Sequence, residues 1–482
     1  MTQVPGETYF DDFEQRLAAT GRDALHMGEI GNGIEIPGPF GPQRLLYADY
    51  VASGRSLRQV EEAVMTDILP WYANSHTEAS HCGATMTRLR RAARDYIARQ
   101  IGAGPDHAVI FAGSGATAGL NRLVHLFGIA DALTQGRDVQ VFVGPYEHHS
   151  NILPWRESGA QVIEIAEGTA GGPCPDALAR ALDRAPAGAL LIGTFSAASN
   201  VTGKLTDIAA ITKLLKAHGA LSVWDYAGGG PYMPIRMDAD GAGIDAIAVS
   251  PHKFLGGPGA SGLLVIRKDA CRATTPTFPG GGTVSFVSPW GHSYSSNIAA
   301  REEAGTPNVV GDLRAALAFA VKAAMGESWL FDRQIDLSAR ALKVLEAAPG
   351  IDLLPAGPGA RLPILSFRVT QPDGTPVHQQ LATRLLSDCF GVQARGGCAC
   401  AGPYVHRLLD IDEPASHALE ARLKAGEELA KPGFVRLSIS ALLTEDEITR
   451  LLDAITQLPE AAARHAAHYQ GCPGTAIFRF AA

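Results

Sequence analysis

The chain has 482 residues, of which 46% are hydrophobic and 19% are charged, and its formal net charge is −8. This composition is typical of a globular protein with roughly two to four structural units. Because the balance is acidic and no long basic run occurs, we expect neither a nucleic-acid nor a membrane partner.

Targeting signals and cysteines indicate the cellular setting. The N-terminal stretch "MTQVPGETYFDDFEQRL" has neither a basic region nor an apolar run, so we expect no secretory signal. Apolar runs such as "GALLIGTF" are far shorter than the ~20 residues of a membrane-spanning helix. The seven cysteines are scattered and odd in number, which favours reduced thiols in a cytoplasmic protein.

Short apolar runs alternate with helical patterns between about residues 105 and 270. Continuous apolar strands separated by helices predict a mainly parallel sheet that is covered on both faces. In such a sheet, ligands bind beyond the carboxyl ends of the strands. The predicted strands are 108–113, 139–145, 189–195, 221–225, 244–250 and 262–268.

A second, smaller domain is predicted after a helical segment that begins near residue 309. Its patterns alternate strand, helix, strand and helix, which favours an α+β unit. These elements are predicted over 362–369, 378–389, 434–440 and 445–455, with a helical excursion over 414–433. We expect an N-terminal extension (1–40) that packs in part on the small domain, a large domain (41–330) and a small domain (331–482).

A lysine and an aspartate follow two of the predicted strands. Lys253 lies in "SPHKFLGG", and a lysine near a core often serves as an amine nucleophile that forms a Schiff base. Asp225 ends the strand 221–225. Taken singly, they could be a surface lysine and a capping carboxylate. Together they match pyridoxal 5′-phosphate (PLP), which binds a lysine and needs an aspartate to keep its pyridine nitrogen protonated.

Two further strand ends carry candidate cofactor residues. "GSGATAGLN" (113–121) predicts a helix N-terminus that binds phosphate, with Thr117 as the hydroxyl, although a plain turn is the alternative. His148, in "GPYEHHSNILPW", follows a strand and could stack on a flat ring or be structural.

These motifs together resemble the class V aminotransferase fold, the group of cysteine desulfurases, selenocysteine lyases and the N-terminal domain of molybdenum-cofactor sulfurases. The resemblance extends from "LLYADYVASG" (45–54) to residue 455. It implies an α/β fold-type-I PLP-dependent transferase, with a mainly parallel sheet of the seven-stranded type and a smaller α+β C-terminal domain. The ordered motifs are "GAT", "EHHSN", "SNVTG", "WDYAG", "SPHK", "GGGT", "GTPN", "RGGCAC" and "VRLS".

The resemblance implies a role for each cofactor residue. Lys253 would be the Schiff-base lysine, and Asp225 would pair with the pyridinium. His148 would stack on the ring and help to move protons, and Asn200 in "SNVTG" would lie beside the ring hydroxyl. The phosphate would be bound by Ala116, Thr117, Ser250 and His252.

Substrate and subunit contacts follow from the same resemblance. Arg436 matches the arginine that binds the substrate carboxylate, a bidentate pair. His76, in "NSHTEASHC", belongs to a segment similar to a loop near the active site and could touch the substrate. "PGGGT" matches a loop that reaches the phosphate of the neighbouring subunit, so Thr283 implies a homodimer. One position departs, because Gly228 stands where desulfurases usually carry glutamine, and this leaves room beside the ring.

The "RGGCAC" loop (395–400) matches the desulfurase loop, with Cys400 at the nucleophile and Arg395 as a nearby charge that favours a thiolate. Cys398 completes a Cys-x-Cys pair like that of molybdenum-cofactor sulfurases, whose C-terminal sulfur-acceptor domain we do not expect here. The resemblance implies that Cys400 takes sulfur from L-cysteine, giving alanine and a persulfide that is passed to an acceptor protein.

Several alternatives stay open. Cys398 and Cys400 could form half of a zinc site with His406, a strained disulfide, or structural thiols, and we predict no metal. The same fold occurs in C–S lyases, epimerases and transaminases. The room that Gly228 leaves beside the ring favours such an enzyme over a desulfurase. A non-catalytic relay protein is disfavoured because Lys253, Asp225 and His148 occur together.

Overall fold

The computed structural model describes residues 4–75, 77–355 and 357–481. It divides into two compact units. The first comprises the chain up to Ile30, Ser53–Ala197 and Thr206–Trp329. The second comprises Gly31–Ala52, Ala198–Leu205 and the chain from Leu330 onward. The N-terminal segment 31–52 is therefore part of the second unit.

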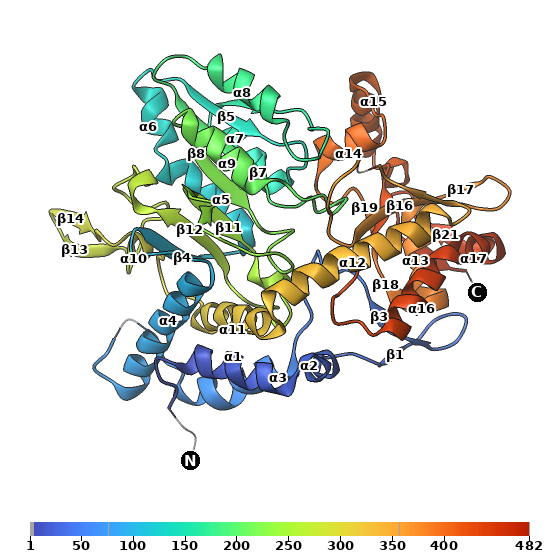
Figure 1. Cartoon of the computed structure of the whole chain (residues 1–482), viewed down its shortest axis with the longest axis horizontal. Helices are drawn as coiled ribbons and strands as arrows, with labels where there is room; N and C mark the ends of the chain where they lie inside the picture. The colour runs from blue at the N-terminus through green and yellow to red at the C-terminus, as the bar shows by residue number, and fades with distance from the viewer. Residues whose placement is uncertain (1–3, 76, 356, 482) are drawn as a thin grey trace. The chain divides into compact units, whose positions relative to one another are not determined.

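A seven-stranded sheet forms the centre of the first unit (Figure 1). Its order is β4-β12-β11-β8-β7-β5-β6, and only β12 runs antiparallel to its neighbours. This mostly parallel sheet confirms the predicted fold class. The strands are β4 (His107–Gly113), β5 (Val139–Val143), β6 (Gln161–Glu164), β7 (Leu190–Ser196), β8 (Leu221–Asp225), β11 (Ala246–Val249) and β12 (Gly262–Arg267).

Helices cover both faces of this sheet. Val223 of β8 belongs to the apolar core that includes Leu120 and Leu123 of α5 (Gly115–Leu126). Successive residues of a strand point to opposite faces, and the next residue, Trp224, donates from Nε1 to Thr212 Oγ1 of α9 (Ile208–Ala217) at 3.0 Å. The apolar run of β8 is therefore explained by burial on two sides.

The remaining helices of the first unit surround the sheet and extend from its lower edge in Figure 1. They are α1 (Tyr9–Thr20), α2 (Arg22–Gly28), α3 (Arg58–Ala63), α4 (His81–Gln100), α6 (Ile129–Thr134), α7 (Leu153–Glu157), α8 (Pro175–Asp183), α10 (Ile298–Glu302) and α11 (Val309–Met325). None of the helices in the described ranges is long and apolar enough to cross a membrane.

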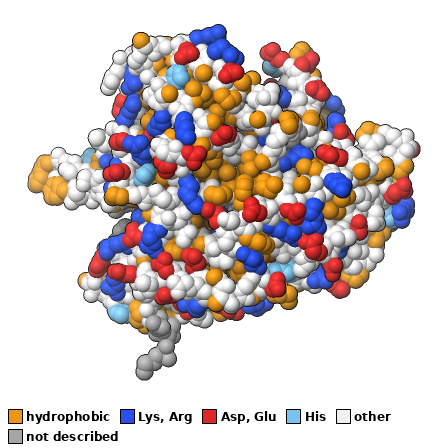
Figure 2. Space-filling model, viewed as in Figure 1, with side chains coloured by type: hydrophobic (Ala, Val, Ile, Leu, Met, Phe, Trp, Pro, Cys, Tyr) orange, Lys and Arg blue, Asp and Glu red, His pale blue; other side chains and the backbone are white. Residues whose placement is uncertain are grey.

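A hairpin projects from the first unit at the left of Figure 1. It pairs β13 (Val284–Ser288) with β14 (Gly291–Tyr294). Three of its large apolar side chains are exposed, with Trp290 at 93%. Figure 2 shows hydrophobic side chains gathered at the end of this hairpin. Exposed apolar residues concentrated in this way are typical of an interaction surface. The three are Phe286, Val287 and Trp290.

The second unit contains a five-stranded sheet with the order β15-β16-β20-β19, and β17 pairs with β16. The strands are β15 (Ile351–Leu353), β16 (Ile364–Thr370), β17 (Pro376–Val377), β19 (Arg395–Gly397) and β20 (Phe434–Ser438). The N-terminal segment joins this unit through β3 (Leu46–Tyr47), which pairs in parallel with β18 (Val392–Gln393). The helices are α12 (Glu327–Glu346, from Leu330 onward), α13 (Gln379–Phe390), α14 (Gly402–Leu408), α15 (Glu413–Lys424), α16 (Glu445–Thr456) and α17 (Leu458–His465).

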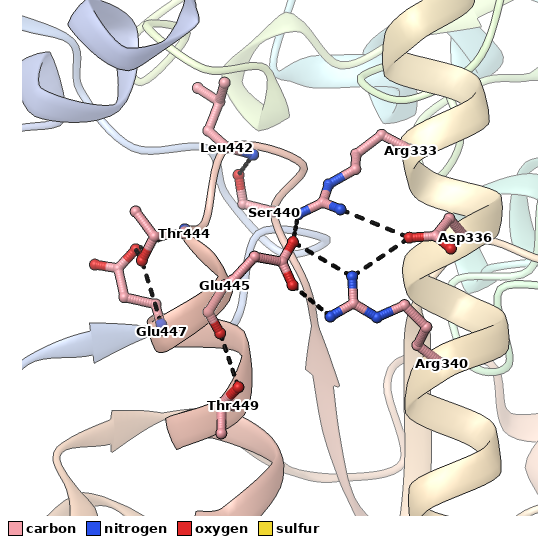
Figure 3. A network of polar contacts seen from close by, with 9 residues as sticks. All are labelled: Arg333, Asp336, Arg340, Ser440, Leu442, Thr444, Glu445, Glu447 and Thr449. Carbon is pink, nitrogen blue, oxygen red and sulfur yellow. Dashed lines mark hydrogen bonds and ion pairs between the residues drawn. The ribbon is translucent and has the colours of Figure 1, made fainter.

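A charged network joins α16 to α12 (Figure 3). Glu445, in the first turn of α16, accepts hydrogen bonds from Arg333 at 2.7 Å and from Arg340 at 2.5 Å. Bonding to both guanidinium groups lowers the pKa of Glu445 to about 2. Thr444 and Glu447 cap the same helix end with a reciprocal capping box. The position of α16 on α12 thus depends on polar bonds as well as on apolar packing.

Candidate active site

The carboxyl ends of four parallel strands meet at one edge of the large sheet. Gly113 ends β4 and leads into α5, and His148 follows β5. Asp225 ends β8, and Lys253 follows β11 in a short 3-10 turn. The predicted cofactor residues of the first unit therefore gather at this edge, apart from Thr283.

The first turn of α5 faces the residues that follow β11. The Ala116 backbone N–H donates to Ser250 Oγ at 2.9 Å. Gly115 has a φ of +61°, and a Cβ at this position would lie 2.7 Å from His252 Cε1 and 3.0 Å from Ser250 Oγ. Glycine is therefore required for this close approach. A helix N-terminus beside a hydroxyl and an imidazole is suited to bind phosphate.

Thr117 and His148 are linked through Ser150. Thr117 Oγ1 lies 2.7 Å from Ser150 Oγ, and both residues line a cavity of about 430 Å³. His148 Nδ1 accepts a hydrogen bond from the Ser150 backbone N–H at 3.1 Å. These bonds fix the orientation of the His148 ring. Its stacking on a cofactor stays a prediction.

Asp225 and Lys253 are two ionisable residues at this edge that interact electrostatically. Asp225 is only 4% exposed, and its Oδ1 accepts a bond from the Ala227 N–H at 2.8 Å. Burial raises the pKa of Asp225, while the Ala227 bond and the charge of Lys253 oppose this effect. Burial and the same lysine lower the pKa of His252 to about 4, so His252 is neutral at pH 7. These groups match the needs of PLP for an anionic partner, an amine and a phosphate cradle.

One buried carboxyl at this edge was missed by sequence reasoning. Glu147 precedes His148 in the quoted "EHHSN" and is 2% exposed. Its carboxylate accepts bonds from the Ser196 N–H at 2.9 Å, the Ser196 hydroxyl at 2.8 Å and the Asn151 amide at 2.5 Å. Its place directly before a candidate ring-stacking histidine was the available signal.

Two predicted residues lack a described role at this edge. Thr283 is fully buried in its own chain, and its hydroxyl donates to the Gly280 carbonyl at 2.7 Å. Its contact with a neighbouring subunit stays a prediction. His76 lies outside the described residues.

In the second unit, two arginines converge on one aspartate. Arg395 Nε donates to Asp49 Oδ2 at 2.9 Å, and an Arg436 terminal nitrogen donates to Asp49 Oδ1 at 3.2 Å. Arg436 is 4% exposed, and burial lowers its pKa despite the opposing charge of Asp49. Arg436 Nε is buried and has no hydrogen-bond partner within the described ranges. This donor remains available for a carboxylate ligand. Sequence reasoning missed Asp49, which lies in "LLYADYVASG".

Asn200 belongs to the second unit and anchors the cysteine loop. Its Nδ2 donates to the Ala399 carbonyl at 2.8 Å, and its own carbonyl accepts from Arg436 at 3.2 Å. A contact between Asn200 and a cofactor hydroxyl stays a prediction. Within this unit, Asn200 links the loop to the buried arginine.

The cysteine loop has a tight bend at the predicted nucleophile. Ala399 and Cys400 have φ values of 52° and 53°, in the left-handed region that residues other than glycine rarely adopt. Such backbone conformations cluster at functional sites. Cys400 is exposed, Cys398 is partly buried, and both are free thiols. Cys400 also interacts electrostatically with Arg436.

A zinc site at this loop lacks its expected third ligand. His406 Nδ1 lies 2.8 Å from the Gly402 carbonyl, and Nε2 lies 3.0 Å from Ser416 Oγ, so both ring nitrogens are engaged. Within the ranges that the structure describes, no group of three or more His, Cys, Asp or Glu residues is arranged to hold a metal ion.

Comparisons with known proteins show the family of this chain. The aminotransferase class-V family model matches residues 46–451. A cysteine desulfurase from Klebsiella pneumoniae is 27% identical over 420 residues, which cover 86% of this chain and 94% of that protein. A probable cysteine desulfurase from Aeropyrum pernix is 30% identical over 370 residues, which cover 74% of this chain and 85% of that protein.

Solved structures share the fold. The apo cysteine desulfurase from Thermococcus onnurineus has a TM-score of 0.70 at 23% identity, over 86% of this chain and 95% of that one. The cysteine desulfurase CsdA from Escherichia coli has a TM-score of 0.66 at 24% identity, over 86% and 94%. The predicted fold-type-I architecture is thus confirmed. The matches describe a cysteine desulfurase-like enzyme from a family that is generally PLP-dependent, and the chain belongs to the aminotransferase class-V family.

Proposed function

We propose that the protein is a PLP-dependent cysteine desulfurase or selenocysteine lyase, which removes sulfur from L-cysteine to give alanine and a persulfide on Cys400. The observation that carries this proposal is the exposed Cys400 thiol on a bend where both Ala399 and Cys400 have positive φ, in the same unit as the buried Arg436. Relatives named as cysteine desulfurases over most of the chain support the same substrate class.

Residues of the first unit would hold the cofactor. The Ala116 N–H and the side chains of Thr117, Ser250 and His252 would bind the phosphate, as the cradle at α5 supports. Asp225 would face the pyridine nitrogen. Bound PLP supplies an electron-withdrawing ring that stabilises negative charge on the substrate carbon.

Three side chains would carry the reaction. Lys253 Nζ accepts the proton from the substrate Cα, and Arg436 holds the substrate carboxylate through its guanidinium. The Cys400 thiolate attacks the substrate sulfur, so that an S–S bond forms as the C–S bond breaks. A proton then completes alanine. One cysteine and one enzyme thiol give one alanine and one persulfide, and no external oxidant or reductant is consumed.

The active form is proposed to be a homodimer in the cytoplasm. The exposed apolar end of the β13–β14 hairpin supports an interface, and the buried Thr283 lies at its base. Seven free thiols support a reducing compartment. A sulfur-acceptor protein is the proposed second partner, because a persulfide must be transferred before the next turnover.

A C–S lyase, epimerase or transaminase is the second candidate. Gly228, buried in the turn after Asp225, stands where the resemblance puts glutamine and favours a different or bulkier substrate. A screen of amino acids with the purified protein distinguishes the two candidate functions. The cofactor spectrum and the products are measured for each amino acid. Alanine from L-cysteine or L-selenocysteine supports the first candidate. Turnover of a bulky amino acid alone supports the second.

A further inference from the structure

Glu147 and Asp225 lie on either side of strand β7, and Glu147 contacts the end of that strand. Ser196 is the last residue of β7 and pairs in register with Asp225, the last residue of β8. Adjacent strands are about 4.8 Å apart. Both the backbone N–H and the hydroxyl of Ser196 donate to Glu147, so its carboxylate is held against this strand end. Two buried carboxyls therefore flank β7 at the cofactor edge.

A layer of neutral polar groups fixes the orientation of Glu147. Asn151 donates to Glu147 from its amide, while its oxygen accepts from Trp155 Nε1 at 3.2 Å and from Thr194 Oγ1 at 2.6 Å. The assignment of the Asn151 amide follows from these bonds. All three donors to Glu147 therefore aim at a carboxylate, and donors of this kind favour its ionised form.

The backbone makes room for this carboxylate. Gly144 follows β5, and a Cβ there would lie 2.7 Å from Glu147 Oε1 and 3.1 Å from Phe195 Cδ1. Even alanine at residue 144 would displace the carboxylate or the phenyl ring. The Glu147 side chain thus folds back over the end of its own strand, toward β7 and β8.

Charges around Glu147 decide when it ionises. Burial raises its pKa to about 7, its three hydrogen bonds oppose this, and the charge of Asp225 raises it further. The groups that contact Glu147, from Ser196 of β7 and from Asn151, are uncharged. His148 is the next residue in the chain. The charge of Lys253 lowers the pKa of Asp225. Glu147 therefore changes charge near neutral pH.

We propose that Glu147 is a positioning residue for the pyridine end of the cofactor, supplying a second carboxylate that acts through Asp225 to keep the ring nitrogen protonated. This inference rests on the proposed PLP function and adds to it a residue that need not touch the ring. The negative charge of Glu147 makes the electrostatic potential near Asp225 more negative. A protonated ring nitrogen bound beside Asp225 would then have a higher pKa.

The test is a pH titration of the ring nitrogen of bound PLP, followed by NMR of protein loaded with PLP that is labelled with ¹⁵N at that atom. Glu147→Gln keeps the side-chain size and removes the charge, whereas Glu147→Asp keeps the charge. Loss of a nearby negative charge should lower the midpoint of the titration by about half a pH unit or more in E147Q. E147D should stay closer to the wild type. Equal midpoints in E147Q and E147D would overturn the inference, since only the shape of the side chain would then matter.

Two further variants complete the test. Asp245 is buried at the opposite edge of the same sheet, where it accepts from the Ser222 N–H at 2.7 Å, and Asp245→Asn should leave the midpoint unchanged. Ser196→Ala removes one donor to Glu147 and keeps the carboxyl, so a smaller fall of the midpoint is expected even where E147Q fails to fold.

The outcomes separate this inference from the function on which it rests. Unchanged midpoints in E147Q and Ser196→Ala, in a protein whose wild type makes alanine from L-cysteine, would overturn the inference alone. A wild-type protein with no visible band after incubation with PLP would overturn both.

Discussion

Arg395 and Arg436 stand opposite each other on β19 and β20, and both donate to the carboxylate of Asp49. Two positive charges and one negative charge leave a net positive cluster in the second unit. The bond to Asp49 therefore helps to orient the arginine that is proposed to bind the substrate carboxylate.

Removing the shared carboxylate should destabilise the protein. Asp49→Asn leaves the buried Arg436 without its counter-charge, and such a loss costs on the order of 3 kcal/mol in the free energy of unfolding. Chemical denaturation measures this change. Arg395→Gln is the matched control, because its side chain is 57% exposed and its pair with Asp49 is expected to be worth less than about 1 kcal/mol. Equal losses in both variants would contradict the account.

Cofactor binding should depend on Lys253. Lys253→Ala is expected to remove the visible absorbance band of protein incubated with PLP, because no other amine is proposed to bond the cofactor. Lys268→Ala is the control from the same unit, since that lysine is exposed and donates to the Pro105 carbonyl. A full band in Lys253→Ala would refute the cofactor assignment.

His252 should make the cofactor-free protein less stable in mild acid. Its pKa is about 4 in the folded chain, below the ordinary 6.5. Between about pH 6.5 and pH 4 the unfolded chain therefore binds a proton here that the folded chain does not, so this contribution to stability is lost as the pH falls through that window. His252→Gln should lose less stability than the wild type over the same range in thermal melts. Parallel losses would show that His252 does not titrate as described.

The β13–β14 hairpin should control oligomeric state. Replacing Phe286 and Trp290 together with serine is expected to weaken the homodimer by about tenfold or more, because exposed aromatic anchors carry much of the energy of an interface. Analytical ultracentrifugation measures the dissociation constant. Met27→Ser is the control, as Met27 is also strongly exposed but lies on α2. A wild-type monomer would refute the dimer proposal outright.

Much of the first unit was predictable because short stretches of its sequence mark the strands and the residues that follow them. The apolar runs that predicted strands over 108–113 and 221–225 correspond to β4 and β8, and Asp225 and Lys253 were located by their places at strand ends. Parallel strands impose this regularity, since their carboxyl ends share one edge.

Other features depend on contacts between distant parts of the chain. Asp49 and Arg436 are 387 residues apart in sequence, and no local pattern marks their bond. Glu147 was hidden for the same reason, because its partner Ser196 is 49 residues away. The sequence predicted a small domain over 331–482 with part of the N-terminal segment packed on it, and the second unit includes Gly31–Ala52 and Ala198–Leu205 as well as the chain from Leu330 onward. The pairing of β3 with β18, which brings the first of these segments into the unit, has no signal in either strand alone.

The proposed function depends on Cys400 as the acceptor of sulfur from the substrate. The most direct test compares the wild type, Cys400→Ala and Cys398→Ala for alanine release from L-cysteine, with mass spectrometry of the peptide that carries both cysteines. We expect a persulfide on Cys400 in the wild type and in Cys398→Ala. We also expect Cys400→Ala to lose alanine formation while it retains the visible absorbance of PLP. Full alanine formation by Cys400→Ala would contradict the claim and favour a C–S lyase that needs no enzyme thiol.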